Sequence, residues 1–243
     1  GLAIGYYLAT KKIPLVYLQN SGLGNTINPL LSLADNSVYA IPMILMIGWR
    51  GKPGETDEPQ HIVQGKLTKD ILETIRIPYL VINKDCSEQD LKRIFEKASQ
   101  ETFSKKHPFA LLVEKGSFES YEDSNNSLTN NLMTREEALE ICIDSISSND
   151  IVVSTTGMLS RELFELRERK GMGHSNDFLT VGGMGHANQI ALGIALNKPN
   201  RNIYCFDGDG SFLMHLGAIK TAGNFAKKNF KYILMNNNAH DSV

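Results

Sequence analysis

The sequence has 243 residues, which is enough for one large domain or two ordinary ones. Hydrophobic residues make up 42% and charged residues 21%, a balance that excludes a disordered or collagen-like chain. The formal net charge of −2 argues against a general nucleic-acid-binding surface, and the most apolar run, residues 41–49, is too short to span a membrane. Three widely spaced cysteines without a CxxC pair argue against disulfides or structural zinc and favour a reducing cytoplasm.

The first half of the chain alternates apolar strands with helices. We expect strands at 13–18, 41–47, 79–82 and 108–114, and a polar loop over 48–65. Helices are expected at 1–9, 28–34, 68–75 and 87–99, the last with Ser87 as its N-cap and Asp90 completing a capping box. Short buried strands that alternate with helices predict a parallel sheet covered on both faces.

A polar stretch separates this half from a second α/β run. Residues 119–133 are rich in Asn, Ser, Asp and Glu and are expected to form a linker. Beyond them we expect helices at 134–148, 160–169, 188–196 and 212–226, and strands at 151–154, 203–206 and 230–235. The sequence therefore predicts an α/β fold with two doubly wound parallel-sheet domains, residues 1–118 and 134–243. The first residues read as a helix already under way, so we expect the N-terminus to be truncated, and the C-terminus as well.

Two polar clusters follow neighbouring predicted strands in the second domain. Gly208-Asp209-Gly210-Ser211 follows one strand and Asn236-Asn237-Asn238 the next, about one βαβ unit later. Both clusters are thus expected at the carboxyl edge of the sheet, where open α/β sheets bind ligands. A carboxylate, an amide oxygen and a loop carbonyl at this edge would suit Mg²⁺, and the glycines would let a diphosphate approach the backbone. Taken singly, each cluster is also typical of an ordinary turn.

The motifs together resemble the phosphonopyruvate decarboxylases of the thiamine diphosphate enzyme family. They are residues 208–211 with 236–237, residues 19–25, residues 48–54 with 57–61, and residues 184–187 with 189–193. The resemblance implies two domains of the thiamine diphosphate-binding fold without a middle domain. It also implies decarboxylation of 3-phosphonopyruvate to phosphonoacetaldehyde and carbon dioxide in phosphonate biosynthesis, with thiamine diphosphate and Mg²⁺. A sulfopyruvate decarboxylase and a non-catalytic subunit of the same fold are the alternatives.

The resemblance implies a cofactor site in the diphosphate-binding domain. Mg²⁺ would be held by Asp209, Asn237 and the backbone carbonyl of Ala239, with Asn236 as a substitute for Asn237. The carbonyl of Gly182 would accept the exocyclic amine of the cofactor, and Met184 would support its bent form. The cofactor-binding residues would be Thr156, Gly157, Gly182, Met184, Gly208, Asp209, Gly210, Ser211 and Asn237.

The pyrimidine-binding domain would contribute the substrate side of the site. Arg50 and Lys52 are candidates to bind the small anionic 2-oxo acid, and His61 is a candidate catalytic proton relay. Solvated loop cations and a structural histidine are the ordinary alternatives for these three residues. The activating glutamate of the family would precede Gly1 and is absent from this sequence. The resemblance further implies a homo-oligomer, at least a dimer, with the active site at the subunit interface; neither nucleic acid nor a membrane is expected as a partner.

The remaining polar residues near these motifs have no assigned role. His186, His240 and Asp241 stand beside the cofactor motifs, whereas His107, His174 and His215 show no partner pattern and are interpreted as ordinary. Nicotinamide dehydrogenases and P-loop enzymes are excluded by spacing, because no third glycine follows Gly208-x-Gly210 at the required position and no P-loop motif is present.

Overall fold

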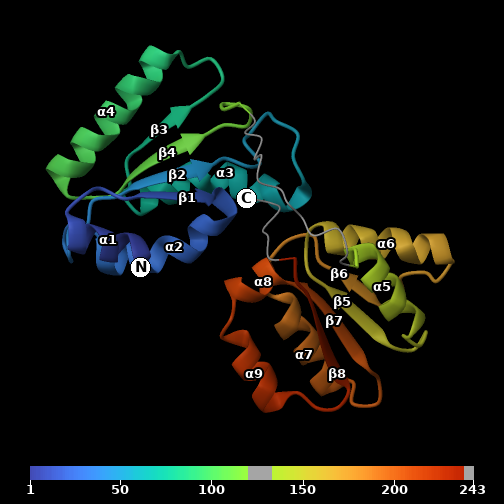
Figure 1. Ribbon diagram of the computed structural model, residues 1–243. Helices are drawn as coiled ribbons and strands as arrows, with labels where there is room; N and C mark the ends of the chain where they lie inside the picture. Colours follow the sequence, from blue (N-terminus) through green and yellow to red (C-terminus); the bar gives the residue numbers. More distant parts are fainter. Residues whose placement is uncertain (120–132, 238–243) are drawn as a thin grey trace. The chain divides into compact units, whose positions relative to one another are not determined.

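The structure is a computed structural model that describes residues 1–119 and 133–237 (Figure 1). The chain divides into two compact units, Gly1–Ser124 and Asn125–Val243. Among the described residues each unit holds a four-stranded sheet whose paired strands all run parallel. The expected linker, residues 119–133, lies almost wholly outside the described residues, so its boundaries stay a prediction.

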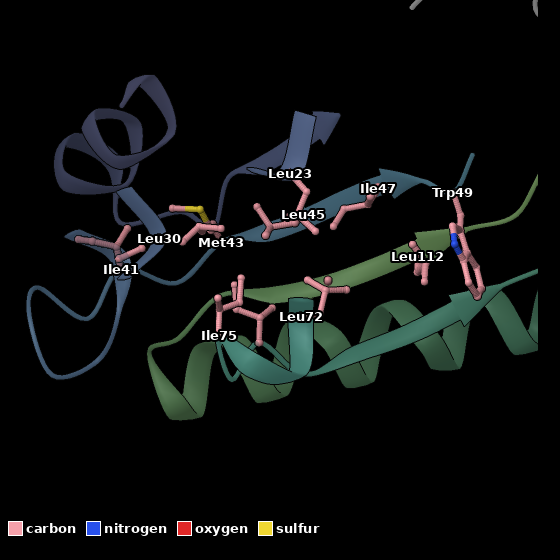
Figure 2. Close-up of a cluster of buried hydrophobic side chains, with 13 residues drawn as sticks. Leu23, Leu30, Ile41, Met43, Leu45, Ile47, Trp49, Leu72, Ile75 and Leu112 are labelled. Carbon is pink, nitrogen blue, oxygen red and sulfur yellow. The ribbon is translucent and has the colours of Figure 1, made fainter. Parts of the chain in front are cut away.

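The sheet of the first unit has the strand order β1-β2-β4-β3 and carries helices on both faces (Figure 1). Leu45 of β2 packs with Leu23 of α2 and Leu72 of α3 on one face (Figure 2), whereas its neighbour Ile44 packs with Ala98 of α4 on the other. Successive side chains of a strand point to opposite faces, so one apolar run can serve both cores. The elements are α1 (Leu2–Thr10), β1 (Leu15–Gln19), α2 (Leu23–Pro29), β2 (Ile44–Gly48), α3 (Pro59–Thr74), β3 (Tyr79–Ile82), α4 (Glu88–Lys105) and β4 (Phe109–Val113).

The sheet of the second unit has the order β6-β5-β7-β8 and is built in the same way. Val152 of β5 packs with Leu139 of α5 and Leu163 of α6, and its neighbour Val153 packs with Ala191 of α7. The elements are α5 (Arg135–Asp144), β5 (Ile151–Ser154), α6 (Met158–Lys170), β6 (Asp177–Leu179), α7 (Ala187–Asn197), β7 (Ile203–Gly208), α8 (Asp209–Met214), α9 (Ala218–Phe225) and β8 (Phe230–Met235).

The predicted α/β class with parallel, doubly covered sheets is confirmed, and so are the starts of the helices expected from residues 87 and 134. Ser87 caps α4 by accepting a hydrogen bond from the Asp90 N–H at 3.2 Å, while the Asp90 carboxylate accepts the Ser87 N–H at 3.1 Å. Thr134 and Glu137 form the same reciprocal pair at the start of α5. Each box satisfies two N–H groups that a helix terminus would otherwise leave without partners.

The polar loop predicted over 48–65 is wrong in its second half, because α3 already begins at Pro59. Proline suits the first helical position, since its missing N–H would have no intrahelical partner there. The buried residues of α3 are His61, Gly65, Thr68 and Leu72, which follow helical spacing. Only Leu72 among them is strongly apolar, so hydrophobic periodicity does not reveal the first two turns.

Other expected boundaries also differ from the structure. The helix expected at 28–34 lies within a longer helical run, in which α2 covers Leu23–Pro29 and a π-turn covers Leu30–Ala34. Strand β6, only three residues long, was not predicted. The helix expected at 212–226 is two helices, α8 and α9, because His215 leaves the helical conformation and a short turn follows it. In the part of the chain that the structure describes, no helix is long and apolar enough to cross a membrane.

Candidate functional site

The two polar clusters singled out in the second unit follow neighbouring parallel strands, as predicted. Strands β7 and β8 are paired with Gly208 opposite Met235, so Asp209 and Asn236 leave the sheet side by side at its carboxyl edge. The Asp209 carboxylate accepts the N–H of Gly210 at 2.7 Å. Asn237 is the last described residue at this edge, and Ala239, His240 and Asp241 lie outside the described residues.

The donors at this edge suit a hard cation better than a soft one. Over residues 1–119 and 133–237, no three or more His, Cys, Asp or Glu side chains gather in a group that could hold a metal ion by themselves. One carboxylate with amide and carbonyl oxygens is instead a donor set for Mg²⁺, which commonly keeps water or phosphate oxygens in its remaining positions. The residue types and their strand-end placement therefore fit the expected metal.

The hydroxyl of Ser211 is turned into the second unit and joins three segments of this edge. Ser211 is buried, its Oγ lies 2.8 Å from Oγ1 of Thr155, and it accepts the N–H of Gly185 at 2.9 Å. Thr155 follows β5, Gly185 belongs to the turn before α7, and Ser211 lies in α8. The side chain expected at the diphosphate thus contacts Thr155 and Gly185 within the protein in the structure described.

The glycine-rich turn after β6 carries Gly182 and Met184 at the same edge of the sheet. Gly183 and Gly185 have positive φ values of 68° and 92°, a conformation that favours glycine. A Cβ on Gly185 would lie 2.4 Å from Nδ1 of His215, so this position is also sterically closed to larger residues. Gly157, which follows β5 beside Thr156, has a φ of 99° at the N-cap of α6. The candidate residues therefore lie on two loops: Thr156 and Gly157 follow the carboxyl end of β5, and Gly182 and Met184 follow that of β6.

His215 lies directly beneath this turn, although no sequence pattern singled it out. Its ring is 4.4 Å from that of His186, and it lines a cavity of about 10 Å³ with Asn188, Asp207 and Tyr232 among others. Nδ1 of His215 and Nδ2 of Asn188 are buried without a hydrogen-bond partner among the described residues. The Asp207 carboxylate accepts the hydroxyl of Tyr232 at 2.8 Å, and burial raises the pKa of that phenol. The cavity beneath this turn is therefore small and is lined by both polar and apolar side chains.

In the first unit, Arg50 follows β2 and pairs with a carboxylate that the sequence did not single out. Its Nε and Nη2 donate to Asp57 at 2.9 and 2.6 Å, a bidentate ion pair. The Asp57 carboxylate also accepts the N–H groups of Gly51 and Glu58. The hydrogen-bonded Arg50 guanidinium holds the pKa of Asp57 far below its usual range, so Asp57 stays ionised.

Lys52, the second expected substrate-binding cation, is held by two carboxylates. Its Nζ lies 2.6 Å from Glu114 at the end of β4 and 3.1 Å from Glu55 in its own loop. Hydrogen bonds to Glu114 and Glu55 raise the pKa of the Lys52 ammonium. Its charge is therefore satisfied by the protein in the structure described.

His61 lies in the first turn of α3 rather than in a loop, and it is buried. Its Nδ1 has no hydrogen-bond partner among the described residues. Burial lowers the pKa of the imidazole, with a further contribution from the nearby Arg50 charge. The ring is consequently neutral near pH 7, the form in which one nitrogen can donate and the other accept a proton. His61 and Arg50 thus lie close together in the first unit, while the cofactor candidates lie in the second.

Comparison with known proteins gives a family match within the second unit and relatives that are similar over nearly the whole chain. Residues 155–243 match the family described as thiamine pyrophosphate enzyme, C-terminal TPP binding domain; thiamine pyrophosphate is another name for thiamine diphosphate. The phosphonopyruvate decarboxylase of Streptomyces viridochromogenes is 36% identical over 93% of this chain and 58% of its own length. That of Streptomyces hygroscopicus is 34% identical over 93% and 57%, and the sulfopyruvate decarboxylase of Methanosarcina acetivorans is 31% identical over 100% and 65%.

The chain therefore spans less than two thirds of the length of these relatives. The similarity nevertheless extends over nearly the whole of this chain, so it includes both units. The C-terminal part of the chain matches the thiamine pyrophosphate-binding domain model, and the chain as a whole is similar to the phosphonopyruvate and sulfopyruvate decarboxylases.

Proposed function

We propose that this chain forms the catalytic core of a decarboxylase that converts 3-phosphonopyruvate to phosphonoacetaldehyde and carbon dioxide with thiamine pyrophosphate and Mg²⁺. The observation that carries the proposal is the 36% identity to a phosphonopyruvate decarboxylase over 93% of this chain. The placement of Asp209 and Asn236 at the ends of paired strands supports the same reading.

The second unit would hold the cofactor. When bound, thiamine pyrophosphate would supply a carbanion and an electron sink for decarboxylation. Asp209, Asn237 and the carbonyl of Ala239 would hold Mg²⁺ against the diphosphate. Gly182 would accept a hydrogen bond from the cofactor's amine, and Met184 would support its bent form. Backbone groups of residues 156–157 and 208–211 would approach the diphosphate, where the glycines leave room for it.

The first unit would bind and orient the substrate. A guanidinium presents N–H groups in a planar fork that matches the oxygens of a phosphonate. Arg50 is therefore the residue we assign to the phosphonate, whereas Lys52, held by Glu114 and Glu55, would need to exchange a carboxylate for the substrate. His61 would move a proton, since its lowered pKa leaves the imidazole neutral at the pH of the reaction.

A complete site would require at least two copies of the chain, with the first unit of one copy facing the second unit of another. Two features support a homo-oligomer. Helix α1 has no buried residue although it is mostly apolar, and Leu2 and Leu8 are 92% and 55% exposed. An apolar groove of about 570 Å³ lies among α1, β1, α2 and the start of β2. Such a surface is typical of a protein interface.

The test compares carbon dioxide release from 3-phosphonopyruvate, sulfopyruvate and pyruvate by the full-length protein with thiamine pyrophosphate and Mg²⁺. A strong preference for 3-phosphonopyruvate would support the proposal. A preference for sulfopyruvate, the substrate named by the 31% identical relative, would retain the cofactor site and overturn the substrate. No release from any of the three, with cofactor bound, would favour a non-catalytic subunit.

A further inference from the structure

The backbone of Arg50 is held on both sides by a single buried side chain, that of Asn20. Nδ2 of Asn20 donates to the carbonyl of Arg50 at 2.8 Å, and Oδ1 accepts the Arg50 N–H at 3.1 Å. Nδ2 also donates to Oγ1 of Thr68 in α3 at 2.9 Å. Asn20 is 2% exposed and follows β1, so it ties the Arg50 peptide to the end of β1 and to α3.

The guanidinium end of Arg50 is held just as firmly by Asp57. Each Asp57 oxygen accepts one N–H from Arg50 and one backbone N–H, from Gly51 or Glu58, with all four distances between 2.6 and 2.9 Å. A carboxylate with four such partners has its acceptor capacity filled. Arg50 is therefore fixed at its backbone and at its head group by two residues that have no role in the proposed decarboxylation itself.

We propose that Asn20 and Asp57 are positioning residues that hold Arg50 with one edge of its guanidinium presented to the phosphonate of the substrate. Asp57 takes Nε and one N–H of Nη2, which leaves both N–H groups of Nη1 and the second of Nη2 for another anion. The Arg50 side chain is 37% exposed, whereas that of Asp57 is 13% exposed. A prearranged planar fork binds an oxyanion with less loss of side-chain entropy than a mobile lysine does.

This inference rests on the proposed function and deepens it, because it assigns oxyanion recognition to Arg50 and not to Lys52. It also predicts that removing the Asp57 carboxylate weakens anion binding, whereas an effect of charge alone would strengthen it. Removing the negative charge of Asp57 strengthens the positive field at Arg50, which by itself would tighten the binding of an anion. If Asp57 acts by orienting the guanidinium, its removal weakens that binding instead.

The test uses Asp57→Asn in the full-length protein, with Asn20→Asp as a second variant that keeps the side-chain shape and loses both N–H donors to Arg50 and Thr68. We expect Asp57→Asn to lower the ratio of kcat/KM for 3-phosphonopyruvate to kcat/KM for pyruvate by about tenfold, the effect of losing one hydrogen bond between charged groups. The loss should appear mainly in KM. In an Arg50→Lys background, Asp57→Asn should change the ratio less than about twofold, because the guanidinium that Asp57 orients is already absent.

The matched control is Glu162→Gln, which breaks a bidentate pair of the same geometry, with Arg135 at 2.6 and 2.7 Å, among residues that the proposal does not use. For this control, the ratio of kcat/KM for 3-phosphonopyruvate to kcat/KM for pyruvate should equal that of the wild type. Equilibrium binding of 3-phosphonopropanoate, which lacks the keto group, gives a second readout that is independent of turnover.

The outcomes separate the inference from the proposed function. If the wild type is active and Asp57→Asn leaves the ratio unchanged or raises it, the positioning role is wrong and the function stands. If the wild type is inactive but binds 3-phosphonopropanoate, and Asp57→Asn weakens that binding about tenfold, the oxyanion site stands without the activity. If the wild type neither turns over nor binds these acids, both proposals fall.

Discussion

Gly65 offers a direct test of how the Arg50 loop meets α3. A Cβ on Gly65 would lie 1.8 Å from the carbonyl oxygen of Gly51 and 2.6 Å from that of Arg50. Both are backbone atoms, so no side-chain rotation can relieve the clash. In Gly65→Ala the loop must therefore move away from α3 by more than an ångström.

The cost of that movement follows from the contacts it disturbs. Nε1 of Trp49 donates to the carbonyl of Gly65 at 2.9 Å, and Asn20 bonds the carbonyl of Arg50 at 2.8 Å. Each hydrogen bond contributes about 1 kcal/mol, and overpacking a tight contact costs about 1–3 kcal/mol. We expect Gly65→Ala to lower the free energy of unfolding of the first unit by about 2–5 kcal/mol.

The assay is chemical denaturation followed by the fluorescence of Trp49, the single tryptophan of this sequence, which is buried beside Gly65. Gly24→Ala is the control, because Gly24 lies in α2 and a Cβ at this position would have no atom within 4 Å. That variant should match the wild type or be up to about 1 kcal/mol more stable, as alanine is the better helix former. A Gly65→Ala midpoint equal to that of Gly24→Ala would refute the close packing of the loop on α3.

Two further predictions concern the cofactor edge and His61. In Asp209→Ala, Mg²⁺-dependent binding of thiamine pyrophosphate should be lost in calorimetry, and an unchanged affinity would mean that the metal assignment is wrong. Burial lowers the pKa of His61, so below about pH 6.5 the unfolded state binds more protons than the folded state and the free energy of unfolding falls as the pH falls. An NMR titration should give a pKa below the ordinary value, and His61→Gln should reduce this pH dependence; a pKa at or above about 6.5 would contradict the burial argument.

The sequence predicted those parts of the structure that depend on local pattern. Strands β5 and β8 match their expected bounds, because short β-branched and apolar runs end at polar residues there. The strand-end motif at Asp209 was found for the same reason, since its position relative to β7 is local. The start of α3 was missed because His61 and Gly65 occupy buried positions usually filled by apolar side chains.

The contacts that arrange the Arg50 loop were beyond pattern-based reasoning. Asn20 meets Arg50 across 30 residues and uses backbone partners, which any residue type would provide. Lys52 meets Glu114 across 62 residues, a pairing that only the order of β2 and β4 in the sheet creates. Asp57 lay within a recognised motif, but nothing in its spacing indicated that it would receive the Arg50 guanidinium.

The hydrogen bond to the Ser211 hydroxyl affects how readily the Gly185 amide exchanges its hydrogen with solvent. Glycine-rich turns usually exchange their amide hydrogens quickly, because they fluctuate without disturbing the rest of a domain. Here the N–H of Gly185 donates to the buried Oγ of Ser211, which also contacts Thr155 at the end of β5. Deuterium should therefore enter this amide only in larger openings that separate α8 from β5. The turn that carries Gly185 would then be protected from hydrogen exchange as strongly as the sheet is. Its rigidity would come from the packing of the core and would be present before any cofactor binds.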